Sequence, residues 1–492
     1  KGEVPDEKIV TYARESKRVI DYLHEHSDVK FTAVPTYTDY YPEAPGGKLG
    51  ARSMECPRFD ASVLGEKLML LQRPHIQSQI MGKFGIMAAE AKKALVNNWR
   101  TKFFMIWQFI KYALRWRKRK KCGRDTSLTA GNSLMARFYW SLLKRDVEMW
   151  RNAPCTGLIV ENDEVVGAKV ERDGKALRIR ARQGVVLAAG GFEWNQDMRE
   201  AYLPKPTKTE WNVGNTWNVG DAIRWGQDLG ADTALLDEAW WTPICIVPGM
   251  SPSFVLVVEK SLPHGIMVNN QGRRFTNEAA PYIDVVHGMY DADKPQGVAI
   301  PAWLVFDATF RHRFPVGPVA PGYAVPDAGA KKYFRNGFLH KAATLEELAE
   351  KLELPFDALR ETIDRFNAMA RKGVDEDFGR GQSASDRYYG DDRCKPNPCL
   401  GPIESAPFYA IRVYPGDLGT KGGLVTDTGS RVLRKDGSVI RGLYATGNCS
   451  ASVMGRTYPG AGGTIGPAIT FGFLAAESAQ ADAAGQSQAG AA

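Results

Sequence analysis

The sequence predicts a mixed α/β (α+β) fold, because β-branched runs and two apolar strands that end in glycine lie among helical segments. Residues 158–161, 165–170 and 177–180 are rich in β-branched side chains and are separated by Asn-Asp and Arg-Asp-Gly turns. Short runs joined by such turns are typical of an antiparallel meander. We therefore expect three antiparallel strands in this part of the chain.

Two further strands are almost wholly apolar and end in small residues. Residues 184–191 read Gly-Val-Val-Leu-Ala-Ala-Gly-Gly, and residues 442–448 read Gly-Leu-Tyr-Ala-Thr-Gly-Asn. Apolar strands of this length are typical of a buried parallel sheet. Because glycine has no side chain, a bound group can approach the backbone closely where these strands end. The same pattern also fits a core strand followed by a glycine turn.

Helical segments surround these strands. Helices are expected over residues 6–28, 102–121, 131–147, 344–371 and 464–478. The first of them is amphipathic, and the last is rich in small residues. Residues 481–492 are low in complexity, and we expect them to form a disordered tail.

The composition is that of an ordinary globular protein. The 492 residues are 44% hydrophobic and 24% charged, with a net charge of +8. Seven scattered cysteines show no zinc-ligand spacing, so we expect free thiols, no metal site and a reducing compartment. No apolar run approaches the ~20 residues that a membrane-spanning helix needs. These features predict a cytoplasmic protein.

Several motifs together resemble one family of flavoproteins. The meander, the Gly-Gly strand, Asn218-Val-Gly-Asp221 and the late Gly-Leu-Tyr-Ala-Thr-Gly-Asn are similar to the fumarate reductase/succinate dehydrogenase-like superfamily. The motif Gly272-Arg-Arg-Phe-Thr-Asn-Glu278 also belongs to that whole superfamily. Four further stretches resemble the 3-ketosteroid Δ1-dehydrogenases and differ from the dicarboxylate reductases. They span residues 39–47, 277–282, 415–423 and 457–462.

The resemblance implies an FAD-binding Rossmann-like domain with a β-meander and an inserted α+β substrate domain. It assigns residues 1–240 and 414–480 to FAD binding and residues 241–413 to the substrate. The family opens with a Gly-x-Gly-x-x-Gly turn after its first strand, whereas no such motif occurs before residue 131. We therefore expect the first βαβ unit to be missing, residues 185–189 to form an exposed apolar edge, and the 492 residues alone to be colourless and inactive.

Desaturation of a 3-ketosteroid needs a group that polarises the C3 carbonyl, a base for the C2 proton and a hydride acceptor for C1. By the resemblance, the Tyr458 hydroxyl and the Gly462 N–H bind the C3 oxygen, where preorganised donors stabilise developing charge. Tyr282 resembles the general base, and Tyr40 resembles the tyrosine that lowers its pKa and passes the proton on. The hydride acceptor is N5 of FAD. A tyrosine with an ordinary pKa of about 10 is a poor base at neutral pH, so the second hydroxyl is needed.

The resemblance also implies a set of FAD contacts. They are Gly190, Gly191, Asp221, Gly447, Asn448, Gly463 and Ile465. The helix that follows Gly463 is expected to present partial positive charge to the reduced flavin. Taken alone, Asp221 is equally well explained as a helix N-cap before Ala222.

Three other interpretations are open. A fumarate- or urocanate-type reductase clamps a carboxylate with an arginine, whereas this chain has Gly460 and Ala461 at the corresponding place. A 3-ketosteroid Δ4-(5α)-dehydrogenase shares the fold and the keto-binding groups, so the sequence separates it less well. The third is an inactive steroid-binding or membrane-associated remnant, because the chain departs from the family at its start.

Residues 102–121 form an aromatic and basic segment, and six of the seven residues from Arg115 to Lys121 are basic. One interpretation is a helix that covers the substrate domain and turns its charged end to solvent. The other is peripheral contact with the inner face of an anionic membrane, to which each basic residue adds ~1 kcal/mol. Nucleic-acid binding is not expected, because no recognition module surrounds the run. The expected partners are a 3-ketosteroid and an electron acceptor that the sequence does not identify.

Overall fold

The computed structural model describes residues 3–88, 90, 99–294 and 296–489. The chain divides into two compact units, each described here by itself. Unit 1 comprises Lys1–Glu25, Asp146–Trp240 and Asp417–Ala492, and unit 2 comprises His26–Arg145 and Trp241–Gly416. Both units are therefore discontinuous in sequence.

The unit boundaries near residues 240 and 416 lie close to the expected domain boundaries, and residues 26–145 pack in one unit with residues 241–416. Their expected assignment to FAD binding stays a prediction. Side-chain contacts within unit 2 give the reason for this packing. The Gln77 side chain donates to the Val255 carbonyl at 2.6 Å and accepts from the Val255 amide at 3.1 Å. The Glu43 carboxylate accepts from the Ser383 hydroxyl at 3.0 Å.

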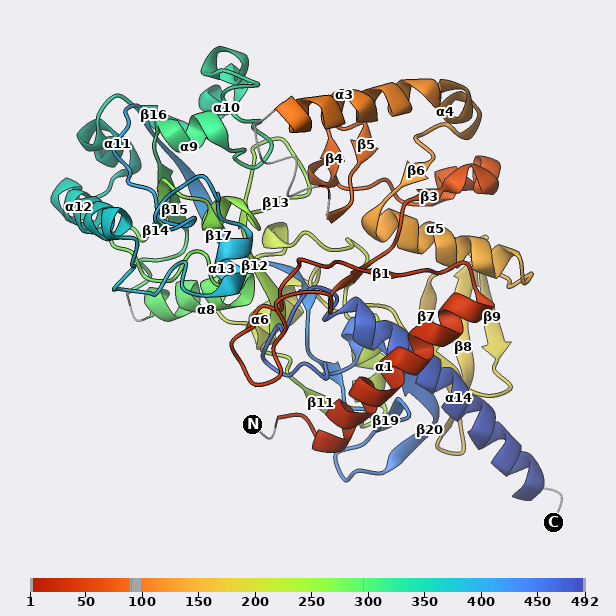
Figure 1. The fold of residues 1–492 in the computed structure, drawn as a ribbon. Coiled ribbons are helices and arrows are strands. Elements are labelled where there is room, and N and C mark those ends of the chain that lie inside the picture. The colour runs from red at the N-terminus through yellow and green to blue at the C-terminus, as the bar shows by residue number, and fades with distance from the viewer. Residues whose placement is uncertain (1–2, 89, 91–98, 295, 490–492) are drawn as a thin grey trace. The chain divides into compact units, whose positions relative to one another are not determined.

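Unit 1 combines a mixed sheet with four helices among its described residues (Figure 1). The helices are α1 (Asp6–His26), α6 (Gln196–Tyr202), α7 (Asp221–Asp228) and α14 (Ile465–Ala489). The strands are β7 (Cys155–Glu161), β8 (Glu164–Arg172), β9 (Lys175–Arg180), β10 (Val185–Leu187), β11 (Thr233–Ala234), β18 (Gly423–Leu424), β19 (Arg431–Leu433) and β20 (Val439–Ala445). Strands β12 (Ala239–Cys245) and β17 (Phe408–Thr420) contain two of the unit boundaries.

The main sheet of unit 1 has the order β10-β20-β8-β7, with β9 paired to β8 and β19 paired to β20. Strands β7, β8 and β9 are antiparallel, which confirms the predicted meander. Strands β10 and β20 are parallel, with Val185 opposite Leu443 and Leu187 opposite Ala445. Within the described residues β20 is the only neighbour of β10, and Val186 is 42% exposed, so the expected apolar edge is present.

Helix α14 runs through the residues that were expected to form a disordered tail. That prediction is wrong for residues 481–489, because alanine and glutamine are good helix formers and Asp482 is anchored. Its carboxylate accepts from the Arg431 guanidinium at 2.6 and 2.8 Å and from the Tyr444 hydroxyl at 2.7 Å. Figure 1 shows α1 beside α14, and Arg18 pairs with Glu477 across them at 2.7 Å.

Unit 2 contains an antiparallel sheet, a set of covering helices and short hairpins. Its helices are α3 (Trp99–Leu114), α4 (Trp116–Cys122), α5 (Ala130–Leu143), α8 (Tyr282–Asp293), α9 (Ala308–Arg313), α10 (Lys331–Arg335), α11 (Leu345–Leu352), α12 (Phe356–Lys372) and α13 (Ala384–Tyr388). Its other strands are β1 (Thr32–Ala33), β2 (Met54–Glu55), β3 (Phe59–Asp60), β4 (Gln79–Ile80), β5 (Phe84–Gly85), β6 (Ser127–Leu128), β13 (Phe254–Val255), β14 (Gly265–Val268), β15 (Ala302–Phe306) and β16 (His340–Ala342).

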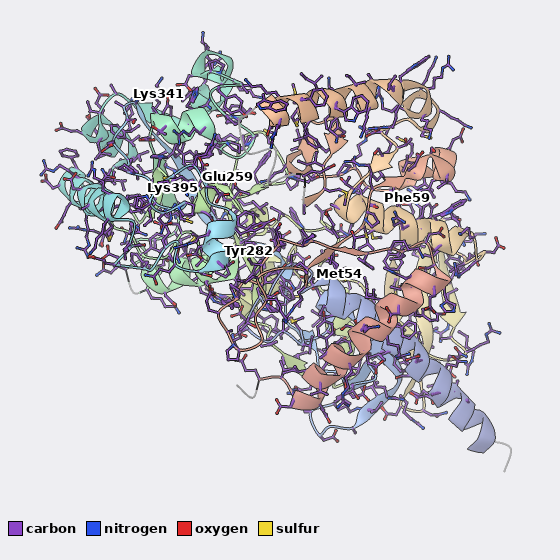
Figure 2. All side chains as sticks on the ribbon, in the orientation of Figure 1. Met54, Phe59, Glu259, Tyr282, Lys341 and Lys395 are labelled. Atoms are coloured by element: carbon purple, nitrogen blue, oxygen red, sulfur yellow. The ribbon has the colours of Figure 1, made fainter. Side chains whose placement is uncertain are left out.

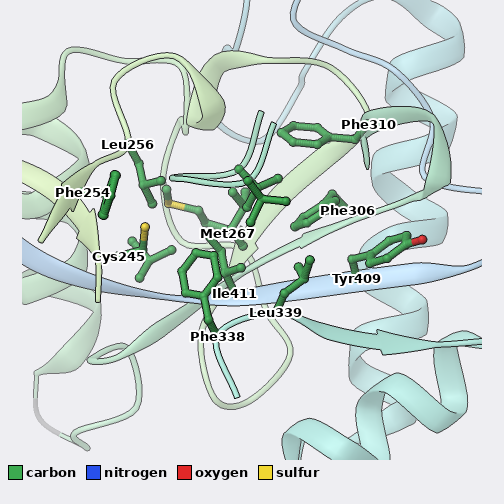
Figure 3. Packing of buried hydrophobic residues seen from close by; sticks show 14 of the residues in the cluster. Cys245, Phe254, Leu256, Met267, Phe306, Phe310, Phe338, Leu339, Tyr409 and Ile411 are labelled. Carbon is green, nitrogen blue, oxygen red and sulfur yellow. The ribbon is translucent and has the colours of Figure 1, made fainter. Parts of the chain in front are cut away.

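The sheet of unit 2 has the order β13-β12-β17-β15-β14, and β16 pairs with β17. One face of this sheet packs into a core of aromatic and aliphatic side chains, which Figure 3 shows at close range. The core includes Cys245, Phe254, Leu256, Met267, Phe306, Phe310, Phe338, Leu339, Tyr409 and Ile411. A second core lies between the sheet and helices α11 and α12. All seven cysteines are free thiols, as expected.

The segment expected to be one helix over residues 102–121 consists of α3 and α4, which meet at Arg115. The phenyl ring of Phe109 packs edge-on against that of Phe84, with ring centroids 5.1 Å apart, so one face of α3 covers the hairpin of β4 and β5. Within the described ranges, none of the helices combines the length and the apolar composition that crossing a membrane requires.

Candidate active site

The parallel strands β10 and β20 lead into two glycine turns in unit 1. The Thr446 amide donates to the Leu187 carbonyl at 3.0 Å, so the two strands end side by side. Gly190 has a φ of +77°, and a Cβ at this position would lie 2.5 Å from Cγ of Asn218. A Cβ at Gly191 would lie 2.0 Å from Oγ1 of Thr420. Only glycine fits here, which leaves the backbone bare at the strand ends.

The buried carboxyl group of Glu193 supports these turns, and sequence reasoning missed it. Its oxygens accept from Nδ2 of Asn218 at 2.5 Å and from the Thr420 amide at 3.3 Å. Burial raises the pKa of Glu193 to about 7. The Glu that directly follows Gly-Gly-Phe was the available sequence signal.

The C-terminal part of unit 1 adds a second set of small residues. A cavity is lined by Trp240, Gly447, Asn448, Gly463 and Thr464, among others. The Trp240 indole N–H donates to Oδ1 of Asn448 at 3.1 Å. Helix α14 begins directly after this lining and has no acidic residue in its first turn. The lining also includes the cation Lys8, so this lysine and a helix N-terminus without acids both favour a bound anionic group.

Asp221 and Ile465, two of the predicted FAD contacts, lie at helix starts. Asp221 is the first residue of α7, and the N-cap position belongs to Gly220 with a φ of +81°. The Asp221 carboxylate forms an ion pair with Arg224 one turn further on. The Ile465 side chain is exposed at the start of α14. The FAD-binding roles of both residues stay predictions.

Tyr458 is buried in unit 1 beside an indole ring and an ammonium group. The Tyr458 and Trp240 rings are 4.8 Å apart at 72°. Nζ of Lys421 donates to the Thr457 carbonyl at 2.5 Å and lies 4.5 Å from the centroid of the Trp240 ring. Burial lowers the pKa of Lys421 to about 8.

Gly462 leaves an amide group available near Tyr458. Its φ is +93°, and no atom lies within 4 Å of where a Cβ would stand. Among the described residues no acceptor is found for its N–H, whereas its carbonyl accepts from the Gly466 amide at 2.8 Å. A free N–H before a helix start suits the binding of a carbonyl oxygen.

Tyr40 and Tyr282 lie together in unit 2, and both are buried. Tyr282 begins α8 directly after Pro281, and Figure 2 labels its side chain. The two hydroxyl groups are hydrogen-bonded, and the rings meet edge-on with centroids 5.1 Å apart. The loop that carries Tyr40 is held by Asp39, whose amide donates to the Lys48 carbonyl at 2.9 Å. The structure thus brings together two residues that are 242 positions apart.

Further tyrosines continue this hydroxyl pair, and the motif reading missed them. The Tyr37 hydroxyl lies 3.4 Å from that of Tyr40 and 2.6 Å from that of Tyr389. Burial raises the pKa of Tyr389 well above its ordinary value. The clustering of tyrosines in Thr-Tyr-Thr-Asp-Tyr-Tyr and in Tyr388-Tyr389 was the only signal in the sequence.

The superfamily motif at residues 272–278 precedes Tyr282 in the sequence and takes part in a buried ionic network. The Arg274 guanidinium binds the carboxylates of Glu278 at 2.8 Å and Asp375 at 2.9 Å. Nζ of Lys260 donates to the Ala280 carbonyl at 2.5 Å and to the Glu278 carbonyl at 3.1 Å. This network fixes the backbone that leads into α8.

The chain matches the FAD binding domain family over residues 2–465, which defines it as an FAD-binding flavoprotein. It is 44% identical over 492 residues to the 3-oxosteroid 1-dehydrogenase of Mycolicibacterium smegmatis, with coverage of 98% of this chain and 84% of the relative. It is 38% identical over 481 residues to the enzyme of the same name from Comamonas testosteroni, with coverage of 96% and 82%.

A solved structure agrees with these relatives. It is the crystal structure of 3-ketosteroid delta1-dehydrogenase from Sterolibacterium denitrificans in complex with 1,4-androstadiene-3,17-dione. The TM-score is 0.94 at 41% identity, over 98% of this chain and 86% of that chain. The chain therefore belongs to the 3-oxosteroid 1-dehydrogenase family.

Proposed function

We propose that this chain is an FAD-dependent 3-oxosteroid 1-dehydrogenase, which introduces a C1–C2 double bond into a 3-ketosteroid. The observation that carries the assignment of roles is the buried hydroxyl pair of Tyr40 and Tyr282, in a chain of this family. FAD, when bound, would supply the oxidant that takes the C1 hydride. The residues that would hold it are Gly190, Gly191, Asp221, Gly447, Asn448, Gly463 and Ile465.

Tyr282 takes the proton from C2. As the C2–H bond breaks, the Tyr282 oxygen receives this proton, and the Tyr40 hydroxyl stabilises the oxygen before transfer because it donates a hydrogen bond to it. The Tyr37 hydroxyl lies next to that of Tyr40 and continues the row of tyrosine hydroxyl groups. Tyr37 itself is half-buried. A base with such a partner works at lower pH than an isolated tyrosine.

Tyr458 and Gly462 bind the C3 oxygen. The hydroxyl of the former and the N–H of the latter donate to this oxygen and stabilise the negative charge that develops on it when the C2 proton leaves. The available amide of Gly462 supports this assignment. The two donors also orient ring A of the steroid.

The test is product analysis with the full natural protein in its FAD-loaded form, androst-4-ene-3,17-dione and an artificial electron acceptor. The expected product is 1,4-androstadiene-3,17-dione. A Δ4-(5α)-dehydrogenase would instead desaturate 5α-androstane-3,17-dione between C4 and C5. A fumarate-type reductase would oxidise a reduced electron donor while it reduces an unsaturated dicarboxylate. Either result without C1–C2 desaturation contradicts the proposal.

We also propose that α3 and α4 contact an anionic membrane surface peripherally. The face of α3 opposite the packed Phe109 is apolar and open to solvent, with Trp99 73%, Phe103 67% and Leu114 72% exposed. The last turn of α4 carries Arg119, Lys120 and Lys121. Exposed aromatic groups beside a basic run are typical of helices that lie in a membrane interface. Figure 1 shows α3 and α4 in line at one edge of unit 2.

Co-sedimentation with vesicles tests this contact. Arg119 stacks on Tyr112, with 3.6 Å from the guanidinium carbon to the ring centroid, so it is kept. The triple variant Arg117→Gln, Lys120→Gln, Lys121→Gln is expected to lose binding to anionic vesicles. The matched triple Lys175→Gln, Arg178→Gln, Arg182→Gln on and just after β9 is expected to keep it. Equal binding of both triples, or binding to neutral vesicles alone, contradicts the proposal.

A further inference from the structure

Lys421 is a fully buried cation that the proposed function does not yet use. It follows β17, and its side chain is wholly excluded from solvent. Its Nζ donates to the Thr457 carbonyl at 2.5 Å. In the described part of the chain no carboxylate forms an ion pair with it, and the neighbouring Glu238 is paired with Arg456 at 3.3 Å.

A buried ammonium group without a carboxylate partner is strongly unfavourable. A methionine of similar length would fill the same space without that penalty. The ring of Trp240, 4.5 Å away, offsets part of the penalty through a cation–π contact. The remaining penalty indicates that the charge serves a purpose at this place.

The contacts of Lys421 converge on Tyr458. The carbonyl that it binds belongs to Thr457, so a single peptide unit separates the ammonium contact from Tyr458. The indole ring that it faces is the one that packs edge-on against the Tyr458 ring. The ammonium therefore fixes both the backbone before Tyr458 and the side chain beside it.

We propose that Lys421 is a positioning residue for Tyr458, which orients its hydroxyl and adds positive charge beside the group that polarises the C3 carbonyl of a 3-ketosteroid. This inference rests on the proposed function and adds a cation to it. Charge placed before the reaction stabilises a developing enolate oxygen without reorganisation. The steroid should therefore bind and react less well when the charge is removed.

Proton loss from Lys421 gives a pH signature. Burial lowers its pKa to about 8, Glu238 and Glu3 act in the opposite direction, and Arg456 lowers it further. Lys421 is charged below about pH 8 and becomes neutral above it. Affinity for 1,4-androstadiene-3,17-dione, a 3-keto ligand that is already desaturated, is expected to fall as pH rises through 8. Lys421→Arg, which stays charged, is expected to remove this dependence.

Three variants of the FAD-loaded protein test the inference. Lys421→Met removes charge and donor, Lys421→Gln keeps a donor without charge, and Lys421→Arg keeps the charge. Lys421→Met is expected to lose about tenfold or more in kcat and in affinity for the dienone. Lys421→Gln is expected to be intermediate, and Lys421→Arg to be close to the unmodified chain. The control is Lys351→Met, an exposed lysine whose Nζ also donates to a backbone carbonyl, at 2.8 Å.

The outcomes separate this inference from the proposed function. An unmodified chain that neither binds the dienone nor forms it contradicts the proposed function, and the inference falls with it. An unmodified chain that does both, with Lys421→Met and Lys421→Gln equal to it in kcat, affinity and pH dependence, overturns the inference alone. Where Lys421→Met fails to fold by circular dichroism, Lys421→Gln decides, because it keeps a neutral N–H donor at this position.

Discussion

The two tyrosines proposed for catalysis differ in their surroundings and share one feature. Tyr282 in unit 2 is hydrogen-bonded to the Tyr40 hydroxyl, which in turn lies beside that of Tyr37. Tyr458 in unit 1 lies beside an indole ring and a glycine turn. In both cases a buried lysine binds a backbone carbonyl just before the tyrosine, Lys260 in unit 2 and Lys421 in unit 1.

These different surroundings allow one residue type to serve two roles. Hydroxyl neighbours can donate to a phenolate and can pass a proton along, which suits a base. An aromatic wall excludes water and so favours a phenol that stays protonated, and a nearby cation makes that phenol a stronger hydrogen-bond donor, which suits the polarisation of a carbonyl.

Tyr282→Phe is expected to have the largest effect. It removes the base and leaves the ring, so kcat should fall by about 10³-fold while binding of 1,4-androstadiene-3,17-dione changes little. Steady-state kinetics and a ligand titration measure the two effects. Retention of most of the activity means that the base is another group.

Tyr458→Phe is expected to lower kcat/KM by about 10²-fold. Because the lost hydroxyl binds the C3 oxygen, affinity for the dienone should fall as well, in contrast to Tyr282→Phe. Equal affinity in the two variants would remove the distinction between base and donor.

Tyr40→Phe is expected to reduce kcat by about tenfold and to move the acid limb of the pH–rate profile to higher pH. The reason is that the Tyr282 oxygen loses the donor that stabilises its deprotonated form. Tyr37→Phe, one hydroxyl further away, serves as the graded control with a smaller shift. A profile that stays unchanged in both variants speaks against the hydroxyl chain.

Lys260→Met removes the buried lysine before Tyr282. It has the smallest expected effect, which is on the free energy of unfolding. Burial lowers the pKa of Lys260 from 10.5 to about 8. Between these two values the unfolded chain keeps a proton that the folded chain has lost, so the free energy of unfolding rises with pH. The rise amounts to roughly 3 kcal/mol at most. The thermal midpoint of the unmodified chain should therefore rise relative to that of Lys260→Met between pH 8 and 10, and a constant difference contradicts this linkage.

Local patterns in the sequence predicted the meander, the parallel strands and most helices, because each of these depends on neighbouring residues. The packing of residues 26–145 into unit 2 could not be predicted in this way. It depends on contacts such as that of Gln77 with Val255, which are 178 positions apart. Helix α14 is longer than the predicted helix, because composition alone does not show that Asp482 binds Arg431.

The predicted site residues follow the same rule. Tyr40 and Tyr282 stand in recognisable motifs, and the structure brings them together. Tyr37, Glu193 and Lys421 act through neighbours that are distant in sequence, such as Asn218 for Glu193. Only the folded chain reveals that Glu193 and Lys421 are buried, that Tyr37 is half-buried, and what these side chains bind.

The contact between α1 and α14 has a consequence for synthesis on the ribosome. Arg18 and Glu477 are 459 positions apart. At about 5–20 residues per second, α1 waits roughly 20 to 90 s for its partner helix. Unit 2, whose last residue is Gly416, can close earlier. During translation the apolar side of α1 is therefore exposed, and the nascent chain is expected to bind holding chaperones until α14 emerges.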